Sequence, residues 1–420
     1  MQTSYLSDLI TAHDFGNPKG IAAICSAHPI VLAATLAQGA KSDRPVLIEA
    51  TCNQVNQDGG YTGMTPADFH ARVHQSAQSE GFDTNNLILG GDHLGPNPWR
   101  HLPAAQAMDK AKAMVAAYAA AGFGKIHLDT SMACADDTAP LSEEVITTRA
   151  ASLATVAEDH AAGQNIVYVI GTEVPVPGGA TEHVETLTLT SPTDAATTVG
   201  LHKEAFRSAG LGKAIDRIVS LVVQPGVEFG HENVVPYAPV AAAPLSQARK
   251  NMGLIYEAHS TDYQSPEALA ALVNDGFAIL KVGPWLTFAL REALYGLDAI
   301  AQELTGVASL QSGMENLMIA HPEHWQGYYH GSADNQRLQR HFSYSDRIRY
   351  YWATSEAEAL VQDLIARLAD KPIPETLISQ YLPMAWPGVM SGAQDPTAAA
   401  LLKGSVQRVL TIYDQACNPL

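Results

Sequence analysis

Two histidines that stand close to acidic residues are the side chains of this sequence best suited to chemistry. His93 directly follows Asp92 in a glycine-rich stretch, and His259 comes two residues after Glu257. Imidazole nitrogens bind zinc and other divalent metals, and a carboxylate or a water can complete the coordination shell. The two histidines therefore predict a divalent-metal site, with zinc as the expected ion. The alternative is that both are hydrogen-bonded core residues.

Eight short apolar runs recur along the chain, and the two histidines stand at the ends of the third and the seventh. The runs cover residues 21–25, 46–51, 87–92, 125–131, 166–173, 218–224, 253–259 and 277–282. Runs that are apolar on both faces are typical of buried parallel strands. Because helical patterns lie between them, the sequence predicts an α/β protein with a (β/α)₈ (TIM) barrel.

The helices between these runs have recognisable ends. Starts are marked by a hydroxyl residue followed by proline and an early acid, and ends by glycine. The starts are Thr65-Pro66, Ser191-Pro192 and Ser265-Pro266, and the glycines are Gly81, Gly122 and Gly276. Residues 286–304 are expected to form the eighth barrel helix. We therefore expect a barrel domain over 1–304 and a mostly helical extension over 305–420, which would be a cap or a contact in a homo-oligomer.

All eight predicted strands end in polar residues. In a TIM barrel these ends meet at one rim, where the reactive groups lie. Burying so many carboxylates without cations would be costly, which again favours a metal. Besides Asp92, His93 and His259, the candidates are the acids Asp129, Glu173 and Glu257, and the polar side chains Asn53, Gln54 and Ser260 as substrate-binding groups.

Three basic residues each allow two interpretations. Lys281 lies inside a predicted strand, where a lysine is costly unless it is paired or reactive. It could form a Schiff base with a ketose, or it could neutralise a phosphate or a carboxylate such as Glu257. The acid- and histidine-rich rim favours the second role. Arg347 and Arg349 form either a solvated helix face or a phosphate clamp.

Composition excludes several classes of function. The chain has 420 residues, a formal net charge of −18 and a pI near 5.2. Nucleic acids and anionic membranes require clustered Lys and Arg, so neither is expected as a partner. Four cysteines without a C-x-x-C pair, and an N-terminus without a signal-peptide pattern, predict a cytoplasmic protein. The sequence contains neither a P-loop nor a G-x-G-x-x-G motif, so kinase and NAD-dependent chemistry are unsupported.

Long motifs also resemble one family almost end to end. They are residues 25–29 (CSAHP), 49–57 (EATCNQVNQ), 59–66 (GGYTGMTP), 90–97 (GGDHLGPN), 171–175 (GTEVP), 256–263 (YEAHSTDY), 281–284 (KVGP) and 345–352 (SDRIRYYW). Together they resemble the D-tagatose-1,6-bisphosphate aldolase subunits of the GatZ/KbaZ type. Members of that family are known as tagatose 6-phosphate kinases, as non-catalytic, chaperone-like subunits of a class II aldolase, or as D-tagatose 6-phosphate 4-epimerases.

This resemblance implies a small phosphorylated ketose as the substrate. Asp92-His93 and Leu128-Asp129 also look like class II aldolases, in which the histidine binds zinc and the aspartate handles protons. The aldolase glycine-rich histidine motif on strand seven is replaced here by Glu257-Ala258-His259-Ser260. The leading hypothesis is a 4-epimerase that uses retro-aldol and aldol steps. The alternatives are a partner of a separate aldolase subunit and a complete tagatose-bisphosphate aldolase.

Overall fold

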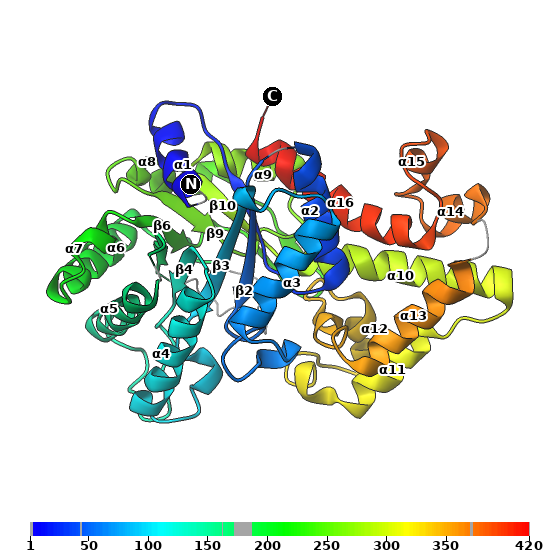
Figure 1. The fold of residues 1–420 in the computed structure, drawn as a ribbon, viewed down its shortest axis with the longest axis horizontal. Helices are drawn as coiled ribbons and strands as arrows, with labels where there is room; N and C mark the ends of the chain where they lie inside the picture. Colours follow the sequence, from blue (N-terminus) through cyan, green and yellow to red (C-terminus); the bar gives the residue numbers. More distant parts are fainter. Residues whose placement is uncertain (1–2, 43, 162, 172–186, 370–372, 420) are drawn as a thin grey trace.

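An eight-stranded parallel barrel forms the centre of the computed structural model (Figure 1). The structure describes residues 3–42, 44–161, 163–171, 187–369 and 373–419. The strands are β1 (Ile21–Ile24), β2 (Val46–Thr51), β3 (Leu87–Leu94), β4 (Lys125–Leu128), β5 (Val167–Ile170), β6 (Ile218–Val223), β9 (Ile255–Ala258) and β10 (Phe277–Val282). They pair in the closed order β1-β10-β9-β6-β5-β4-β3-β2. Seven strands lie within the predicted apolar runs, and β3 extends two residues beyond its run, so the predicted TIM barrel is confirmed.

Helices cover the outside of the barrel between consecutive strands. They are α2 (Pro29–Ser42), α3 (Pro66–Ser79), α4 (Ala104–Ala120), α5 (Glu143–His160), α6 (Pro192–Ser208) with the short α7 (Gly212–Ile215), α8 (Pro239–Arg249) and α9 (Pro266–Asn274). A small hairpin, β7 (Glu228–Phe229) and β8 (Val234–Val235), follows β6. The predicted N-caps are confirmed, because Thr65, Ser191 and Ser265 each accept a hydrogen bond from the amide three residues on. The three predicted glycines have the positive φ of a helix C-terminus.

The first helix fills the end of the barrel where the strands begin. Helix α1 (Ser4–Asp14) places Leu6 and Leu9 in an apolar cluster with side chains from the early part of the strands. The strand residues of this cluster are Ile21, Ala23, Leu47, Ile88, Val167, Val219, Ile255, Ala278 and Ile279. This end of the interior is therefore dry and aliphatic, and the polar strand ends lie at the opposite mouth.

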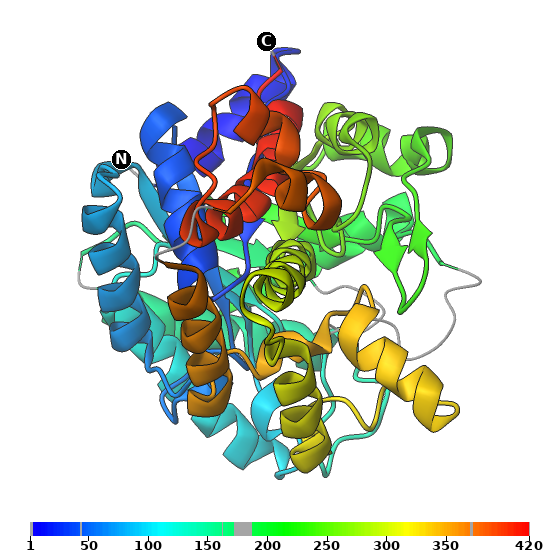
Figure 2. The same ribbon diagram turned by 90° about the vertical axis from the view of Figure 1, so that its right-hand side faces the viewer.

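A helical extension follows β10. It comprises α10 (Pro284–Thr305), α11 (Leu310–Ala320), α12 (Ala333–Phe342), α13 (Ser355–Ala369), α14 (Glu375–Tyr381), α15 (Trp386–Met390) and α16 (Ala398–Cys417), with the short 3₁₀ turns η4 (Pro322–His324) and η5 (Arg347–Tyr350). Figure 2 looks almost along α10, with α11 to α13 on one side and α14 to α16 on the other. The predicted mostly helical C-terminal region is thus present.

The last helix, and not the first helix of the extension, completes the ring around the barrel. Helix α16 packs against α2, α9, α10 and strand β1. The amide of Gly20 donates to the carbonyl of Cys417 over 2.8 Å, which fixes the end of α16 beside β1. Residues 286–304, which we expected in this place, form most of α10, whose partners lie mainly in the extension. An apolar helix face can be identified from sequence, but the partner it packs against cannot.

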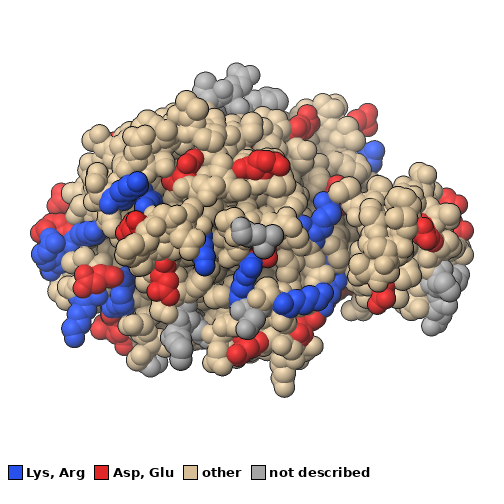
Figure 3. Space-filling view, turned by 90° about the horizontal axis from the view of Figure 1, so that it is seen from above, with Lys and Arg blue, Asp and Glu red and all other residues tan. Residues whose placement is uncertain are grey.

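No helix of the described ranges is both long enough and apolar enough to cross a membrane. On the face of the molecule shown in Figure 3, Lys and Arg side chains are interspersed with Asp and Glu side chains. This face therefore carries no continuous basic surface of the kind that nucleic acids require.

Candidate metal centre

Three histidines and one aspartate meet at the mouth of the barrel. Asp92 and His93 lie at the end of β3, His127 lies on β4, and His259 directly follows β9. All four are buried, and their potential ligand atoms lie within 4.8 Å of one another. The ring centroids of His93 and His259 are 4.9 Å apart, and that of His127 is 4.9 Å from the first and 5.6 Å from the second. The two histidines predicted to share a metal are thus neighbours in space.

Each imidazole is held by a hydrogen bond through one of its nitrogens. Nδ1 of His93 bonds a carboxylate oxygen of Asp129 over 2.9 Å, and Nε2 of His259 bonds Glu257 over 3.0 Å. Nε2 of His127 donates to the carbonyl of Gly171 over 2.9 Å. Such a bond orients a metal-binding histidine and fixes its tautomer. In His127 the other nitrogen, Nδ1, bonds a carboxylate oxygen of Asp92 over 2.9 Å, and an ion at this nitrogen would replace that bond. The donor set and its support therefore fit a divalent metal.

The backbone is irregular where it presents these side chains. His93 has a φ of 50°, and Ser260, next to His259, has a φ of 52°. Non-glycine residues rarely adopt this left-handed region, and such strain is frequent at functional sites. The pairing of β3 with β4 also shifts register between Gly91 and Leu94. This irregularity turns His93 toward the barrel axis, which regular strand alternation would not do.

A layer of buried ion pairs lies beside the histidines. Nζ of Lys125 is 2.5 Å from a carboxylate oxygen of Glu49 and 2.7 Å from one of Glu257. Nζ of Lys281 is 2.7 Å from Asp92, contacts Glu49, and lies 3.7 Å from Glu257. All five side chains are at most 6% exposed. Two ammonium groups thus neutralise part of the charge of three carboxylates, as buried ions require.

Gly90 makes room for this charged layer. A Cβ atom at Gly90 would lie 2.7 Å from a carboxylate oxygen of Glu49 and 2.9 Å from its Cγ, closer than van der Waals contact allows. Any side chain there would push Glu49 away from the two lysines. Gly90 therefore serves the site itself.

Burial and neighbouring charges set the protonation states. Burial raises the pKa of Asp92, but the charges of His93 and Lys281 outweigh it and hold the pKa well below its usual value. Burial lowers the pKa of His259 to about 3, so this ring is neutral and has a lone pair for a metal. Burial also opposes the charge on Lys281, yet the nearby acids, Asp92 foremost, raise its pKa well above the usual value. Lys281 is therefore a permanent cation.

A cavity of about 150 Å³ opens above the histidines. Its floor includes Asp92, His93, His259 and Lys281. Segments 51–54 and 260–262 and residues Cys25, Tyr61, Asn97 and Phe229 form much of the wall, together with Ser345, Arg349 and Tyr350 from the extension. The extension thus reaches over the barrel mouth and contributes polar groups to the cavity.

The remaining predicted residues are placed in three ways. Asn53, Gln54, Ser260, Lys281 and Arg349 line the cavity. Asp129 and Glu257 lie behind the histidines that they hold, so Glu257 supports His259 and does not belong to the cluster itself. Glu173 lies outside the described residues.

Arg347 is placed differently from Arg349, the other arginine expected in the phosphate clamp. Its guanidinium carbon lies 3.4 Å from the ring centroid of Tyr328, and Nε donates to the carbonyl of His324. It is absent from the described lining of the cavity, which contains Arg349 instead. A 3₁₀ turn has three residues per turn, so Arg347 and Arg349, which are two positions apart, point in different directions and need not reach one ligand.

Sequence reasoning missed His127 and Lys125. The alternation Lys125-x-His127-x-Asp129 was the available signal, because residues two apart on a strand share a face. Both residues stand in the run 125–131, from which only Asp129, nearer the end of the strand, was chosen as a candidate. Tyr61 and Tyr350, which line the cavity from outside the strands, carried no comparable signal.

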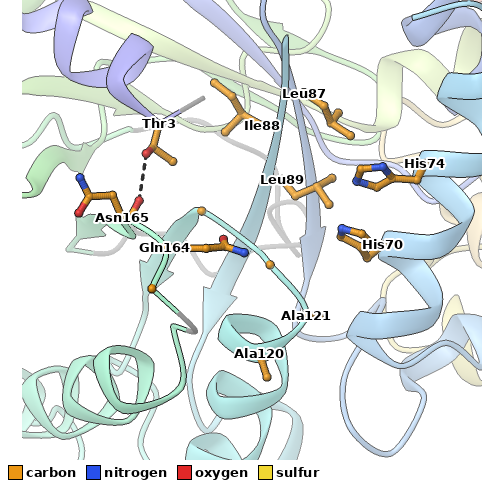
Figure 4. Close-up of a pocket in the computed structure, with 13 residues that line it drawn as sticks. Thr3, His70, His74, Leu87, Ile88, Leu89, Ala120, Ala121, Gln164 and Asn165 are labelled. Carbon is orange, nitrogen blue, oxygen red and sulfur yellow. Dashed lines mark hydrogen bonds between the residues drawn. The ribbon is translucent and has the colours of Figure 1, made fainter. Parts of the chain in front are cut away.

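Two other places are less suited to a cation. Cys25, Glu49 and Asp92 could form a second ligand group, but the ammonium of Lys281 already contacts both carboxylates. A larger cavity of about 720 Å³ lies where β3 begins (Figure 4). There His70 and His74 stack with ring centroids 4.1 Å apart, and none of the described lining residues is acidic. The cluster at the opposite mouth is therefore the candidate centre.

Known proteins resemble this chain over most of its length. The family model for "D-tagatose-1,6-bisphosphate aldolase subunit GatZ/KbaZ-like" matches residues 6–418. A crystal structure of a probable tagatose 6 phosphate kinase from Sinorhizobium meliloti 1021 has 53% sequence identity and a TM-score of 0.90, covering 95% of this chain and 100% of that one. A fructose-bisphosphate aldolase from Campylobacter jejuni has 16% identity and a TM-score of 0.45, covering 88% of this chain and 94% of its own.

Proposed function

Because the chain belongs to the GatZ/KbaZ-like family of D-tagatose-1,6-bisphosphate aldolase subunits, we propose that it is a D-tagatose 6-phosphate 4-epimerase that forms D-fructose 6-phosphate. One observation carries the proposal. Three oriented imidazoles and Asp92 form a buried cluster below a small polar cavity lined by Arg349. A cluster of this kind suits carbon–carbon bond cleavage next to a carbonyl, and an arginine suits a phosphate.

His93, His127 and His259 would hold a divalent cation, for which the donor set favours zinc. The ion would supply a Lewis acid for substrate oxygens. Asp129 and Glu257 keep two of the rings in place through the hydrogen bonds described above. A hydrogen bond to Asp92 raises the pKa of His127 despite its burial, and metal binding would replace that proton.

Asp92 is the proposed base for the C4 hydroxyl. Its low pKa keeps it ionised, and it lines the cavity beside the histidines. Removal of the hydroxyl proton lets the C3–C4 bond break, which leaves an enediolate and glyceraldehyde 3-phosphate. The aldehyde turns its other face and the bond forms again, which inverts C4. Asp92 is held ready for this role by Lys281, whose Nζ lies 2.7 Å from its carboxylate.

The phosphate is assigned to Arg349, because Lys281 is already surrounded by carboxylates. Ser260, Asn53 and Gln54 supply further hydrogen-bonding groups in the same cavity. The raised pKa of Lys281, which comes mainly from Asp92, also argues against a Schiff base, since an ammonium group cannot attack a carbonyl. Four free cysteines agree with a cytoplasmic location.

The direct test is to incubate the purified protein with D-tagatose 6-phosphate and zinc and to measure D-fructose 6-phosphate. We expect product that chelation abolishes and zinc restores, without accumulation of free triose phosphate. His127→Ala should lose this activity. His70→Ala, which changes a histidine at the other end of the barrel, should keep it and is the matched control. Absence of product from the zinc-loaded wild-type protein would overturn the proposal.

A second candidate function follows from the family description, which names an aldolase subunit. A non-catalytic subunit would show no turnover alone and would form a stable complex with a separate class II aldolase chain on co-expression. A complete aldolase would release triose phosphates from D-tagatose 1,6-bisphosphate. A kinase, as the Sinorhizobium meliloti relative is named, would consume ATP, for which this sequence has no P-loop. These assays therefore distinguish an epimerase, a non-catalytic subunit, an aldolase and a kinase.

A further inference from the structure

Tyr350 brings a second ionisable group to the cavity, from the extension and not from the barrel. It is the last residue of η5, is half-buried, and lines the same cavity as Asp92 and the histidines. The metal cluster and Asp92 belong to the barrel strands. The cavity thus has one set of reactive groups on its barrel side and this phenol on its extension side.

Two guanidinium groups surround the Tyr350 ring. The guanidinium carbon of Arg349 is 4.4 Å from the ring centroid and that of Arg347 is 4.9 Å away. Nη2 of Arg349 donates to the phenol oxygen over 2.9 Å. Tyr61 packs edge-on with a centroid distance of 4.9 Å, and His324 stacks at 5.3 Å. These contacts fix the ring and favour a negative charge on its oxygen.

The surrounding charges act on the ionisation of this phenol. Burial alone would raise the pKa of Tyr350, but the positive charges of Arg349 and Arg347 outweigh it and lower the pKa. Tyr61, in the same cavity, has its pKa raised by burial. Of these two neighbouring tyrosines, Tyr350 therefore gives up its proton more readily, and it is the one better suited to proton transfer.

The proposed reaction needs such a group for a geometric reason. When the aldehyde turns its other face, the oxygen on C4 points to a different side of the cavity. A base that removes the proton from one epimer is then badly placed to return it to the other. Efficient epimerisation therefore calls for proton-transfer groups on two sides.

We propose that Tyr350 is the second catalytic acid–base residue of this site and serves the C4 hydroxyl of one epimer, while Asp92 serves that of the other. This inference rests on the proposed epimerase function. Starting from the epimer that faces Asp92, the carboxylate takes the hydroxyl proton, the O–H electrons form the C4 carbonyl, and the C3–C4 electrons form the enediolate. After the aldehyde turns, the enediolate carbon attacks C4, and the new alkoxide takes the proton of Tyr350. The proton on Asp92 then passes through water to the phenolate, which restores both groups.

The test uses hexacyanoferrate(III), which oxidises the enediolate, with zinc-loaded protein and each ketose 6-phosphate separately. In Tyr350→Phe we expect enediolate formation to fall about 100-fold or more from one epimer and by only a few-fold from the other. Net epimerisation should fall equally in both directions, as the fixed equilibrium requires. Tyr328→Phe, which alters a ring that stacks on Arg347 outside the described cavity lining, is the matched control and should behave as wild type.

Each other outcome has a definite meaning. If enediolate formation falls equally from both epimers, Tyr350 is a binding or structural residue. If it does not fall at all, Tyr350 is dispensable. Either result overturns the inference about Tyr350 but not the proposed epimerase function. A wild-type protein that yields oxidisable enediolate from neither substrate would refute the proposed function, and the role of Tyr350 with it. Absorbance titration at 295 nm checks the ionisation independently. The wild-type protein should have one more tyrosine that ionises at a lower pH than the other tyrosines, and Tyr350→Phe should lack it. Identical titrations of the two proteins would contradict the inference.

Discussion

The two ends of the barrel interior are filled in opposite ways. Where the strands begin, Leu6 and Leu9 of α1 close an aliphatic cluster. Where the strands end, Lys125 and Lys281 lie among three carboxylates. Apolar burial stabilises the fold without strict geometry, whereas buried ions are tolerated only as a matched set. The apolar end therefore stabilises the fold. The charged end holds reactive groups at a cost in the free energy of folding, which the apolar end offsets.

The strongest test of this contrast removes one charge from the matched set. Lys125→Met keeps the length of the side chain but removes one of the two cations that Glu49 and Glu257 share, so that Lys281 alone remains beside them. We expect the free energy of unfolding to fall by about 3–5 kcal/mol, the usual effect of breaking a buried ion pair. Urea unfolding of the metal-free protein measures it. Adding Glu49→Gln should recover part of the loss, and a Lys125→Met protein as stable as wild type would contradict the contrast.

At the aliphatic end, Leu9→Ala should leave a cavity beneath α1. The expected loss in the free energy of unfolding is about 3 kcal/mol, within the usual range for a buried leucine. The same urea unfolding measures this loss. Leu338→Ala on α12, where the side chain is 48% exposed, is the matched control and should change the free energy by less than about 0.5 kcal/mol. Epimerase activity well below the melting temperature should survive in both variants, and selective loss of activity in Leu9→Ala would show that the two ends are coupled.

A smaller effect is expected from a residue that only supports a ligand. Asp129→Asn keeps the shape of the side chain but weakens its hold on Nδ1 of His93. Zinc affinity should fall by roughly 10- to 100-fold, which corresponds to about 1.4–2.8 kcal/mol. Competition with a chromogenic chelator measures it, with exposed Asp109→Asn as the control. Unchanged affinity would mean that Asp129 does not orient the ring.

The smallest effect is expected from Glu228, a buried carboxyl at the barrel mouth. Among the described residues, no Lys or Arg forms an ion pair with it. Burial raises its pKa from 4.5 to about 7. Between these two pH values the folded state keeps a proton that the unfolded state has lost. The contribution of Glu228 to the free energy of unfolding is therefore full below pH 4.5 and disappears as the pH rises through 7. Glu228→Gln should remove this slope and make the metal-free protein more stable than wild type at pH 8, by on the order of 1–2 kcal/mol. Parallel pH–stability curves for the two proteins would refute this assignment.

Sequence patterns were sufficient for the barrel and for expecting His93 and His259 together at its mouth. The strands were predictable because buried parallel strands require apolar runs, and His93 and His259 because they stand beside acids at the run ends. His127 was missed because a ligand in the middle of an apolar strand resembles a core residue. The cavity wall from the extension was not predictable either, since Tyr350 reaches the site through tertiary packing alone. Local patterns determine elements, and long-range packing determines which of them share a site.

The docking of α16 beside β1 affects how the protein can be made. Synthesis proceeds from the N-terminus, so all eight strands leave the ribosome well before residues 398–417 are added. Until then, the groove between α2 and α9 has nothing to cover its apolar walls. The ring of helices around the barrel can therefore close only after residues 398–417 have been made. A chain that is released early would expose that groove to chaperones or to aggregation.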